Sequence, residues 1–402
     1  MDYNKSSQRE RWIFTPERLV RAGRETNGAG EEGAKQRGSG GEREGEGEGH
    51  EIRAQRHREA EEKYIKTCEE TRGTSAAESA PAPAPPPVPT LAEEHVLLRY
   101  CASSLLRICR SLRSPRGVRS TATAYLWRAY LTWSPLQRDP RAALLACIYL
   151  ASKAEEAYVS AAELSRLSGT SPDAILRGEV ALLGALRYDL AIHGPFRAAS
   201  GFLEDDDLQP YVDRALAAER ERQKEPGREP PSVASVAAAL GRDAEAACDA
   251  LLLTDAPMLH APGRLGLAAV RSAFAKRGVR IDDYLATVVR RAQSAEWKAK
   301  DQTKDGRGDE TNGSGETADA SLARLLASLS EIDALAAAAG QEAAQDEQAV
   351  GAIDAKLRAC REAARAPAGN GGDQARVKEE RKARERAARR AAAEAAVGVS
   401  DL

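Results

Sequence analysis

The chain has 402 residues, and its 59 basic and 61 acidic side chains leave a formal net charge of −2, which gives no overall attraction to nucleic acid. Aromatic residues make up only 4% of the chain and much of its 42% apolar share is alanine, so closely packed helices are favoured over sheets. No apolar run approaches the ~20 residues of a membrane-spanning helix and the six cysteines lack a C-x-x-C spacing, so we expect a soluble protein with reduced thiols and no metal site.

The first 72 residues predict helices that flank a folded core, interrupted by a low-complexity insert. Residues 26–50 are rich in Gly, Glu and Arg, a composition that buries too little apolar surface to fold. The insert contains a G-x-G-x-x-G pattern at 28–33, but no strand precedes it, so we do not interpret it as nucleotide binding. Residues 51–72 favour a helix with opposite charges at i,i+4 spacing, which we interpret as a solvated surface helix.

Two aromatic residues precede a helix start in the N-terminal arm. Thr15 can cap a helix whose first turn contains Pro16. Trp12 and Phe14 are large apolar groups in an otherwise polar segment, and Leu19 lies within the predicted helix. We predict that Trp12, Phe14 and Leu19 dock this helix on the core.

A Ser/Ala/Pro-rich tract at 73–90 predicts a semi-rigid linker, and the first folded unit is expected over 91–192. Apolar residues recur at helical spacing in five segments joined by short loops, which predicts one compact helical bundle. The predicted helices cover 91–112, 118–133, 139–156, 160–168 and 172–188.

The third of these segments is the predicted centre of the bundle. Asp139 can cap its start, and Pro140 fits the first helical position. No charged residue occurs from Ala142 to Ala151, and a helix that is apolar on every side must be surrounded by other helices. The polarity then changes at Lys153, so the helix is expected to present a lysine at the rim of the bundle.

A second helical group is predicted over 193–340, with polar inserts at 205–231 and 295–320 for which we expect disorder. An apolar helix at 262–276 is similar in character to the central helix of the first group, which suggests an internal duplication. Residues 341–402 predict a C-terminal helix and a basic, alanine-rich tail. The helices predicted in this part cover 195–203, 233–254, 262–276, 281–292, 321–340 and 347–365.

One acidic residue interrupts an apolar stripe. Glu179 falls within the apolar face that we assign to the helix at 172–188, which includes Leu176 three residues before it and Leu183 four residues after it. Its carboxylate should therefore lie at the margin of the core, where it needs a donor or a cation. Lys153, at the end of the central helix, is the candidate. Spacing alone also allows a simpler interpretation, in which Lys153 interacts with its own helix C-terminus and Glu179 is an ordinary surface residue.

The segment that ends near this lysine resembles the cyclin box. The shared features are a helix ending in Ala-x-Lys-x-x-Glu, here LASKAEE, and a later helix with a glutamate before apolar residues, here RGEVALLGAL. Three further segments resemble the cyclin H family at its N-terminus, at the junction of its two folds and in its second fold; they read YNKSSQRERWIFTPERL, LRYDLAIHGPFRAASGFLEDD and ALLLTDAPMLHAPGRLGLAAV. The resemblance implies an all-α protein of two tandem cyclin folds, five-helix bundles with flanking helices at both ends, in which Lys153 and Glu179 form the kinase-binding pair.

This resemblance implies a regulatory subunit that performs no chemistry and needs no cofactor. Such a subunit would bind a cyclin-dependent kinase and push the kinase's regulatory helix into its active position, as part of the CDK-activating kinase. The family's other partners are a RING-finger assembly factor and the TFIIH core, and its roles are in transcription by RNA polymerase II and the cell cycle. The expected location is the nucleus, without contact to membranes or direct contact to nucleic acid.

Three other interpretations remain open at this point. A cyclin C-like subunit of the Mediator kinase module would keep the fold and change the partner. A TFIIB-like double helical repeat would bind promoter DNA, but the charge balance is weak for phosphate binding and no paired cysteines supply a zinc ribbon. An enzyme would need a catalytic or metal-binding spacing, and the five histidines are isolated.

Overall fold

The computed structural model describes residues 6–12, 51–73, 85–222, 230–302 and 317–365, and every regular element in these ranges is a helix. The all-α prediction is therefore confirmed. None of the helices in these ranges is both long enough and apolar enough to cross a bilayer.

The first helical group is a bundle whose helices start close to where the sequence predicts. Its members are α4 (Leu91–Ser111), α5 (Arg116–Thr132), α6 (Pro140–Ala154), α7 (Ala161–Ser168) and α8 (Pro172–Ala185). The side chain of Asp139 accepts a hydrogen bond from the Arg141 amide at the start of α6, and Ser160 and Ser171 cap α7 and α8 in the same manner. The polar residues that the sequence places before each apolar run thus fix where these helices begin.

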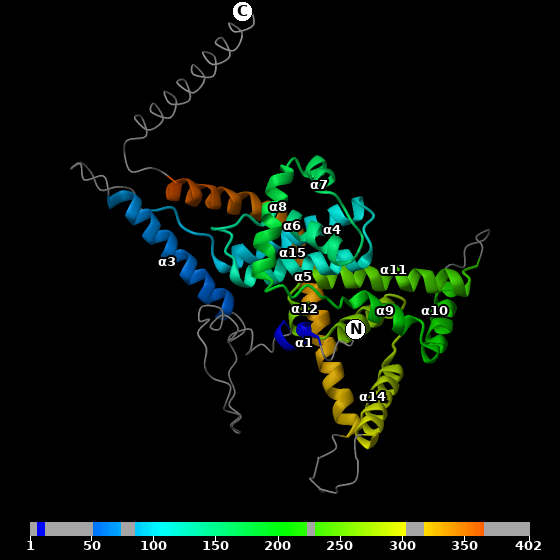
Figure 1. The fold of residues 1–402 in the computed structure, drawn as a ribbon. Coiled ribbons are helices and arrows are strands. Elements are labelled where there is room, and N and C mark those ends of the chain that lie inside the picture. Colours follow the sequence, from blue (N-terminus) through cyan, green and yellow to red (C-terminus); the bar gives the residue numbers. More distant parts are fainter. Residues whose placement is uncertain (1–5, 13–50, 74–84, 223–229, 303–316, 366–402) are drawn as a thin grey trace, which may run out of the picture.

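Helix α6 is the centre of this bundle. The side chains of Cys147, Ile148 and Ala151 have no exposed surface, because α4, α5 and α8 pack around the helix (Figure 1). The C-terminal end of α6 reaches the rim, which places Lys153 at the surface.

The second helical group repeats this arrangement around α13. Its members are α9 (Pro195–Leu203), α10 (Gln209–Arg222), α11 (Val233–Leu252), α12 (Ala256–Leu259), α13 (Pro262–Ala275) and α14 (Asp282–Gln302). Helix α13 packs against α9 and α11. It approaches α9 so closely that a Cβ added at Gly266 would lie 2.7 Å from the backbone nitrogen of Ala199, so only glycine fits there.

Part of each insert predicted for this group is helical. The segment 205–231, which we expected to be disordered, contains α10, and the segment 295–320 contains the end of α14 and the start of α15 (Ala318–Arg365). Charged residues dominate α10 and obscured its short apolar stripe in the sequence. The buried residues of that stripe are Tyr211, Val212, Ala215 and Leu216. Residues 223–229 and 303–316 lie outside the described ranges.

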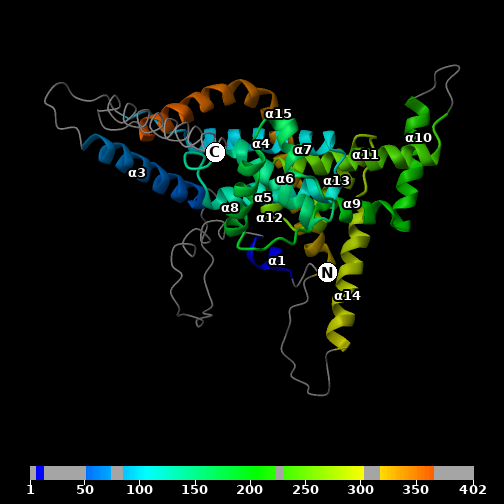
Figure 2. The same ribbon diagram turned by 45° about the horizontal axis from the view of Figure 1, so that its top comes forward.

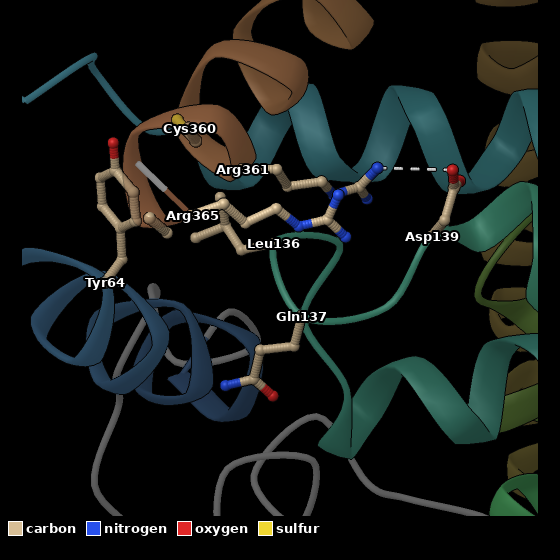
Figure 3. A pocket seen from close by; sticks show the side chains of 8 residues that line it. Tyr64, Leu136, Gln137, Asp139, Cys360, Arg361 and Arg365 are labelled. Carbon is tan, nitrogen blue, oxygen red and sulfur yellow. Dashed lines mark hydrogen bonds and ion pairs between the residues drawn. The ribbon is translucent and has the colours of Figure 1, made fainter. Parts of the chain in front are cut away.

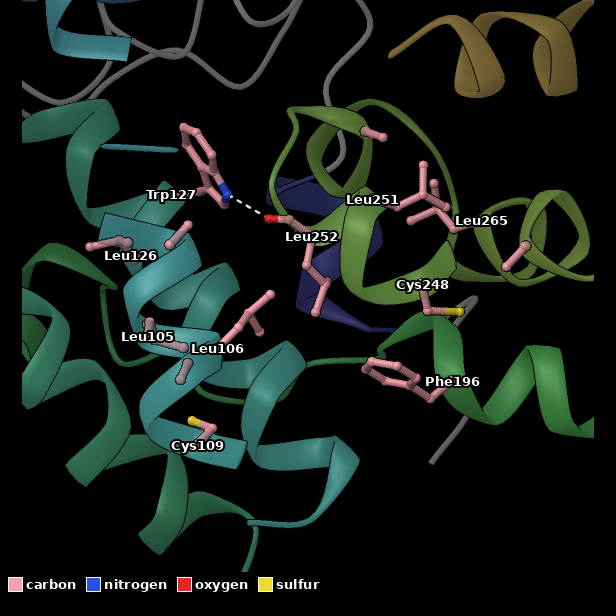
Figure 4. Close-up of a cluster of buried hydrophobic side chains, with 14 of the residues drawn as sticks. Leu105, Leu106, Cys109, Leu126, Trp127, Phe196, Cys248, Leu251, Leu252 and Leu265 are labelled. Atoms are coloured by element: carbon pink, nitrogen blue, oxygen red, sulfur yellow. Dashed lines mark hydrogen bonds between the residues drawn. The ribbon is translucent and has the colours of Figure 1, made fainter. Parts of the chain in front are cut away.

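The two groups share one hydrophobic core, which Figure 4 shows at their junction. The indole nitrogen of Trp127 on α5 donates a hydrogen bond to the Leu252 carbonyl on α11 at 3.0 Å. On the same helix, the buried guanidinium of Arg119 pairs with Glu245 at 2.5 Å and with Asp249 at 3.4 Å. Directional polar contacts within an apolar interface fix the orientation of one bundle on the other.

Helix α15 is continuous from Ala318 to Arg365, whereas the sequence predicted two helices separated near Gly340. A glycine inside a helix is unfavourable by about 1 kcal/mol, which tertiary contacts on both sides offset here. The first half packs on α11, α13 and α14 of the second group, and the second half packs on α4 of the first group. The helix therefore ties both groups together.

Helix α3 (Glu51–Gly73) is not the solvated helix that its charge pattern predicted. Arg56 forms a buried ion pair with Glu94 at 2.5 Å, and Arg53 donates two hydrogen bonds to Asp255 at 2.7 and 2.8 Å. Burial lowers the pKa of Arg56, although the neighbouring Glu94 opposes that effect. Helix α3 ends beside the last turns of α15, so both flanking helices meet at one edge of the molecule (Figures 1 and 2). The buried residues of α3 are Arg53, Arg56, Ala60, Tyr64 and Cys68.

Candidate functional site

Lys153 and Glu179 form an ion pair at the rim of the first bundle. The Lys153 Nζ lies 2.6 Å from Oε1 of Glu179, although the two residues belong to different helices. The side chain of Glu179 is 12% exposed and that of Lys153 is 43% exposed, so the carboxylate sits at the margin of the core and the lysine reaches over it from solvent. The contact expected from the sequence is formed, and its role in binding a partner stays a prediction.

Small residues bring the two helices close enough for this contact. Gly178, immediately before Glu179 on α8, faces Ala146 on α6, and a Cβ added at Gly178 would lie 3.0 Å from the Cβ of Ala146. That spacing is tighter than an ordinary van der Waals contact, so a larger residue at either position would separate the helices. The crossing of α6 and α8 therefore determines the geometry of the pair.

The end of α6 is held by a second carboxylate. The hydroxyl of Thr121 on α5 donates a hydrogen bond of 2.6 Å to Oε1 of Glu155. Gly117 leaves the room for this side chain, because an added Cβ would overlap the Glu155 carboxylate. The chain then turns through Glu156, which has a φ of 54°. These contacts fix the last turn of α6 and, with it, the origin of the Lys153 side chain.

The lysine is held in its charged form. The pKa of Lys153 is raised, mainly by its hydrogen bond to Glu179, while partial burial acts in the opposite direction. The ammonium group also lies 5.0 Å from the centre of the Tyr149 ring, within the range of a cation–π contact. Because ion pairs this exposed contribute only about 0–1 kcal/mol to stability, a change at this pair should affect binding much more than folding.

No protein-family model matches the chain. Over 312 residues the chain is 28% identical to Cyclin-H1-1 of Arabidopsis thaliana, an alignment that covers 73% of this chain and 77% of the relative. It is 29% identical to Cyclin-H of Xenopus laevis over 202 residues, which are 48% of this chain and 56% of the relative. Its fold is that of a chain in the CAK complex of Chaetomium thermophilum bound to ATP-γ-S, with a TM-score of 0.56, 20% identity, and coverage of 96% of this chain and 95% of that one.

Over 73% of its length the chain is therefore similar to a cyclin H, and it shares the fold of a chain in a CAK complex. Cyclin-C1-1 of Arabidopsis thaliana is 33% identical, but only over 118 residues, which are 27% of this chain and 47% of that relative. The match to a cyclin H from the same plant thus extends over more than twice as many residues.

Apolar side chains that face solvent lie beside the ion pair on α8. On α8, Val180 is 70% exposed and Leu176 is 40% exposed. Leu176 lies three residues before Glu179, on the same side of the helix, and Val180 lies one turn after Leu176 and directly follows Glu179. Tyr158, just after α6, is also exposed and lies close enough to contribute to the raised pKa of Lys153. Our assignment of Leu176 to the buried face of this helix was wrong. The periodicity of the sequence could not show that this side chain faces solvent.

Trp12, the first of the three predicted docking residues, lies at the junction of the two cyclin folds. It directly follows the short helix α1 (Ser7–Arg11), which the sequence did not predict. The Trp12 ring is buried beneath the guanidinium of Arg128, and its indole nitrogen donates to Asp189 at 3.1 Å. Gln8 accepts a hydrogen bond from the His193 amide at 2.5 Å and donates one to its carbonyl at 3.2 Å. Phe14, Leu19 and the Thr15 helix start lie outside the described residues.

A depression lies at the opposite end of α6 from Lys153, between the flanking helices (Figure 3). Its volume is about 460 Å³, and its walls come from α3, α15 and the loop before α6. Arg361 spans it by pairing with Asp139 at 3.4 Å and donating to the Pro135 carbonyl at 2.7 Å. These contacts hold α15 against the start of α6, so we interpret this region as structural.

Among the described residues, no three His, Cys, Asp or Glu side chains gather as metal ligands. The described cysteines are buried and free, and burial raises the pKa of several, including Cys109 and Cys248, each to about 12. A thiol that remains protonated at neutral pH is a poor nucleophile.

Proposed function

We propose that this chain is a cyclin H-type regulatory subunit that binds and activates a cyclin-dependent serine/threonine kinase through the surface around Lys153 and Glu179. The observation that carries the proposal is the geometry of that surface, where an exposed ion pair is bordered by the outward-facing Leu176 and Val180. Apolar side chains gain free energy when a partner covers them, and an ammonium beside a carboxylate can pair with both charges of a complementary helix.

The cyclin itself would perform no reaction. Phosphoryl transfer in a kinase needs a lysine–glutamate ion pair that forms only when the kinase's regulatory helix is correctly placed. A rigid bundle that binds the active position of this helix more tightly than the inactive one shifts the kinase population towards the active state. The fixed crossing of α6 and α8 supplies such a rigid surface.

The larger complex that we propose rests on the similarity to known proteins and not on a contact within this chain. The neighbour with the same fold is part of a CAK complex bound to ATP-γ-S. We propose by analogy a CDK-activating kinase with a RING-finger assembly factor, its association with the TFIIH core, and a nuclear role in transcription by RNA polymerase II and the cell cycle.

The direct test is a charge exchange, Lys153→Glu with Glu179→Lys. The exchange keeps the attraction within the chain but presents the opposite charges to the kinase. We expect an unchanged melting temperature, loss of kinase capture in a pull-down, and loss of kinase activity on a polymerase-tail peptide. The Lys153→Ala, Glu179→Ala double variant should give the same result.

The matched control is the surface pair of Arg280 and Asp282 in the second bundle, which lie 2.6 Å apart. Exchange of these two charges should leave both capture and activity unchanged. Normal capture and activation by the Lys153/Glu179 exchange variant would overturn the assignment of the surface.

The similarity to a cyclin C supports a second candidate function, that of a subunit of the Mediator kinase module. Mass spectrometry of a native purification separates the two. TFIIH subunits are expected with the chain, and Mediator subunits in their place would favour the cyclin C-like function.

A further inference from the structure

We infer that Ser171, in the loop between α7 and α8, is a phosphorylation site for a proline-directed serine/threonine kinase. The inference does not depend on the proposed function, because it concerns this chain as a substrate. It rests on the exposure and backbone conformation of one Ser-Pro sequence compared with two others in the same chain.

The described residues contain three Ser-Pro sequences, at Ser114, Ser134 and Ser171, and Thr15-Pro16 lies outside them. Ser134 is 1% exposed, and its hydroxyl contacts Glu94 at 3.4 Å. Ser114 is partly exposed as a residue, but its hydroxyl oxygen is buried. A kinase must reach the hydroxyl oxygen, so Ser114 and Ser134 are inaccessible to a kinase in the folded chain.

Ser171 differs from both in exposure and backbone conformation. Ser171, Pro172 and Asp173 are all exposed. The backbone of Ser171 is extended, with φ of −62° and ψ of 144°, as expected for a residue that precedes proline. A kinase binds its substrate as an extended segment, so the first turn of α8, which begins at Pro172, must open when Ser171 is phosphorylated. Its hydroxyl is engaged only by the Ala174 amide at 3.3 Å, a long bond that a phosphate oxygen can replace.

ATP is the phosphate donor in this step. The Ser171 Oγ attacks the γ-phosphorus of ATP, the bond from that phosphorus to the bridging oxygen breaks, and ADP leaves. The hydroxyl proton passes to the catalytic aspartate of the kinase. The product carries a phosphate at the N-terminus of α8, where first-turn amides and the helix dipole favour negative charge. Phosphorylation therefore strengthens the start of the helix that carries Glu179.

The experiment treats the folded full-length chain, in a Thr15→Ala background, with ATP and a purified mitogen-activated protein kinase, followed by phosphopeptide mapping. We expect about one phosphate per chain at Ser171 and at least tenfold less incorporation in Ser171→Ala. Ser114→Ala is the matched control and should incorporate as much as its parent. Peptides of about 15 residues around each of the three serines should all be labelled, because Ser114 and Ser134 are inaccessible only when the chain is folded.

A second readout tests the consequence for α8. Amide exchange at Asp173, Ala174 and Ile175 should slow severalfold in the phosphorylated chain relative to the unmodified chain. Comparable labelling of Ser114 or Ser134 in the folded chain, or an unlabelled Ser171, would overturn the inference. Unchanged exchange in α8 would overturn the predicted effect of the phosphate on the helix.

Discussion

The carboxylate of Glu93 joins the start of α4 to a residue 263 positions later in the chain. It accepts a hydrogen bond of 2.8 Å from the Thr90 amide, while the Thr90 hydroxyl accepts one from the Glu93 amide, which completes a capping box. It also pairs with Lys356 on α15. Burial alone would raise the pKa of Glu93, but the hydrogen bonds from Lys356 and from Thr90 outweigh it, and the pKa is lowered.

Glu93→Gln separates these two roles, because glutamine can still complete the capping box. The ion pair with Lys356 is lost, so we expect the free energy of unfolding at pH 7 to fall by about 0.5–1 kcal/mol. A lowered carboxyl pKa stabilises the fold above the unfolded-state value of 4.5, and this stabilisation disappears as the pH falls through the folded-state pKa. The difference between wild type and variant, measured by urea unfolding, should therefore shrink below about pH 4.5. A difference that stays constant down to pH 3 would contradict this account.

At the scale of helices, the close crossing of α6 and α8 is the feature on which the candidate site depends. Gly178 allows this approach, whereas Gly184, later on the same helix, has no neighbouring atom within 4 Å of an added Cβ. The two glycines therefore allow the same substitution to be compared in a tight and in an open position.

We expect Gly178→Val to push α8 away from α6 and to lower the free energy of unfolding by about 1–3 kcal/mol more than Gly184→Val does. The change should also weaken kinase capture, because Lys153 and Glu179 move apart. Thermal unfolding and the pull-down measure the two effects. Equal loss of stability in both variants would mean that helix propensity, rather than the crossing, is responsible.

Helices with strong local signals were predictable from the sequence, and those held by distant contacts were not. Asp139 with Pro140, and Ser171 with Pro172, gave the starts of α6 and α8 because a cap acts on its own first turn. The five-residue α1 also has a cap, Ser6, but a helix this short is not stable alone and depends on the contacts of Gln8 and Trp12 with the junction.

In the candidate site, too, local features could be predicted from the sequence and features set by distant contacts could not. Glu179 could be singled out because it interrupts an apolar pattern, and the resemblance to cyclins supplied its pairing with Lys153. The outward position of Leu176 could not be predicted, since it depends on how far α8 is rotated against its neighbours. The buried face of α3 was missed because Arg53 and Arg56 look like solvated residues until Asp255 and Glu94 are placed beside them.

At the scale of the whole molecule, α15 joins the two cyclin folds and closes the edge where the flanking helices meet. The C-terminal half of α15 buries apolar side chains against the first fold and pairs with it through Asp354 and Lys356. The first fold is therefore incomplete without the last helix of the chain. The side chains buried in this half are Val350, Ile353, Leu357 and Cys360.

A chain ended after Ala339 should lose several kcal/mol of stability, since burial of each large apolar side chain contributes about 1.5–3 kcal/mol as an upper estimate. We expect the first fold to unfold at a lower temperature than the second, so that one calorimetric transition becomes two. A chain ended after Arg365 is the control and should unfold like the full-length protein. A single unshifted transition in the shorter chain would show that α15 does not tie the folds together.

The pairing of Glu93 with Lys356 also has a consequence for biosynthesis. A ribosome delivers α4 long before it delivers the second half of α15, because proteins are made from the N-terminus. Part of the apolar surface of the nascent first bundle therefore stays exposed until nearly the whole chain has been translated. That interval is when a chaperone is needed, and any premature stop upstream of Val350 leaves a product that cellular quality control can recognise.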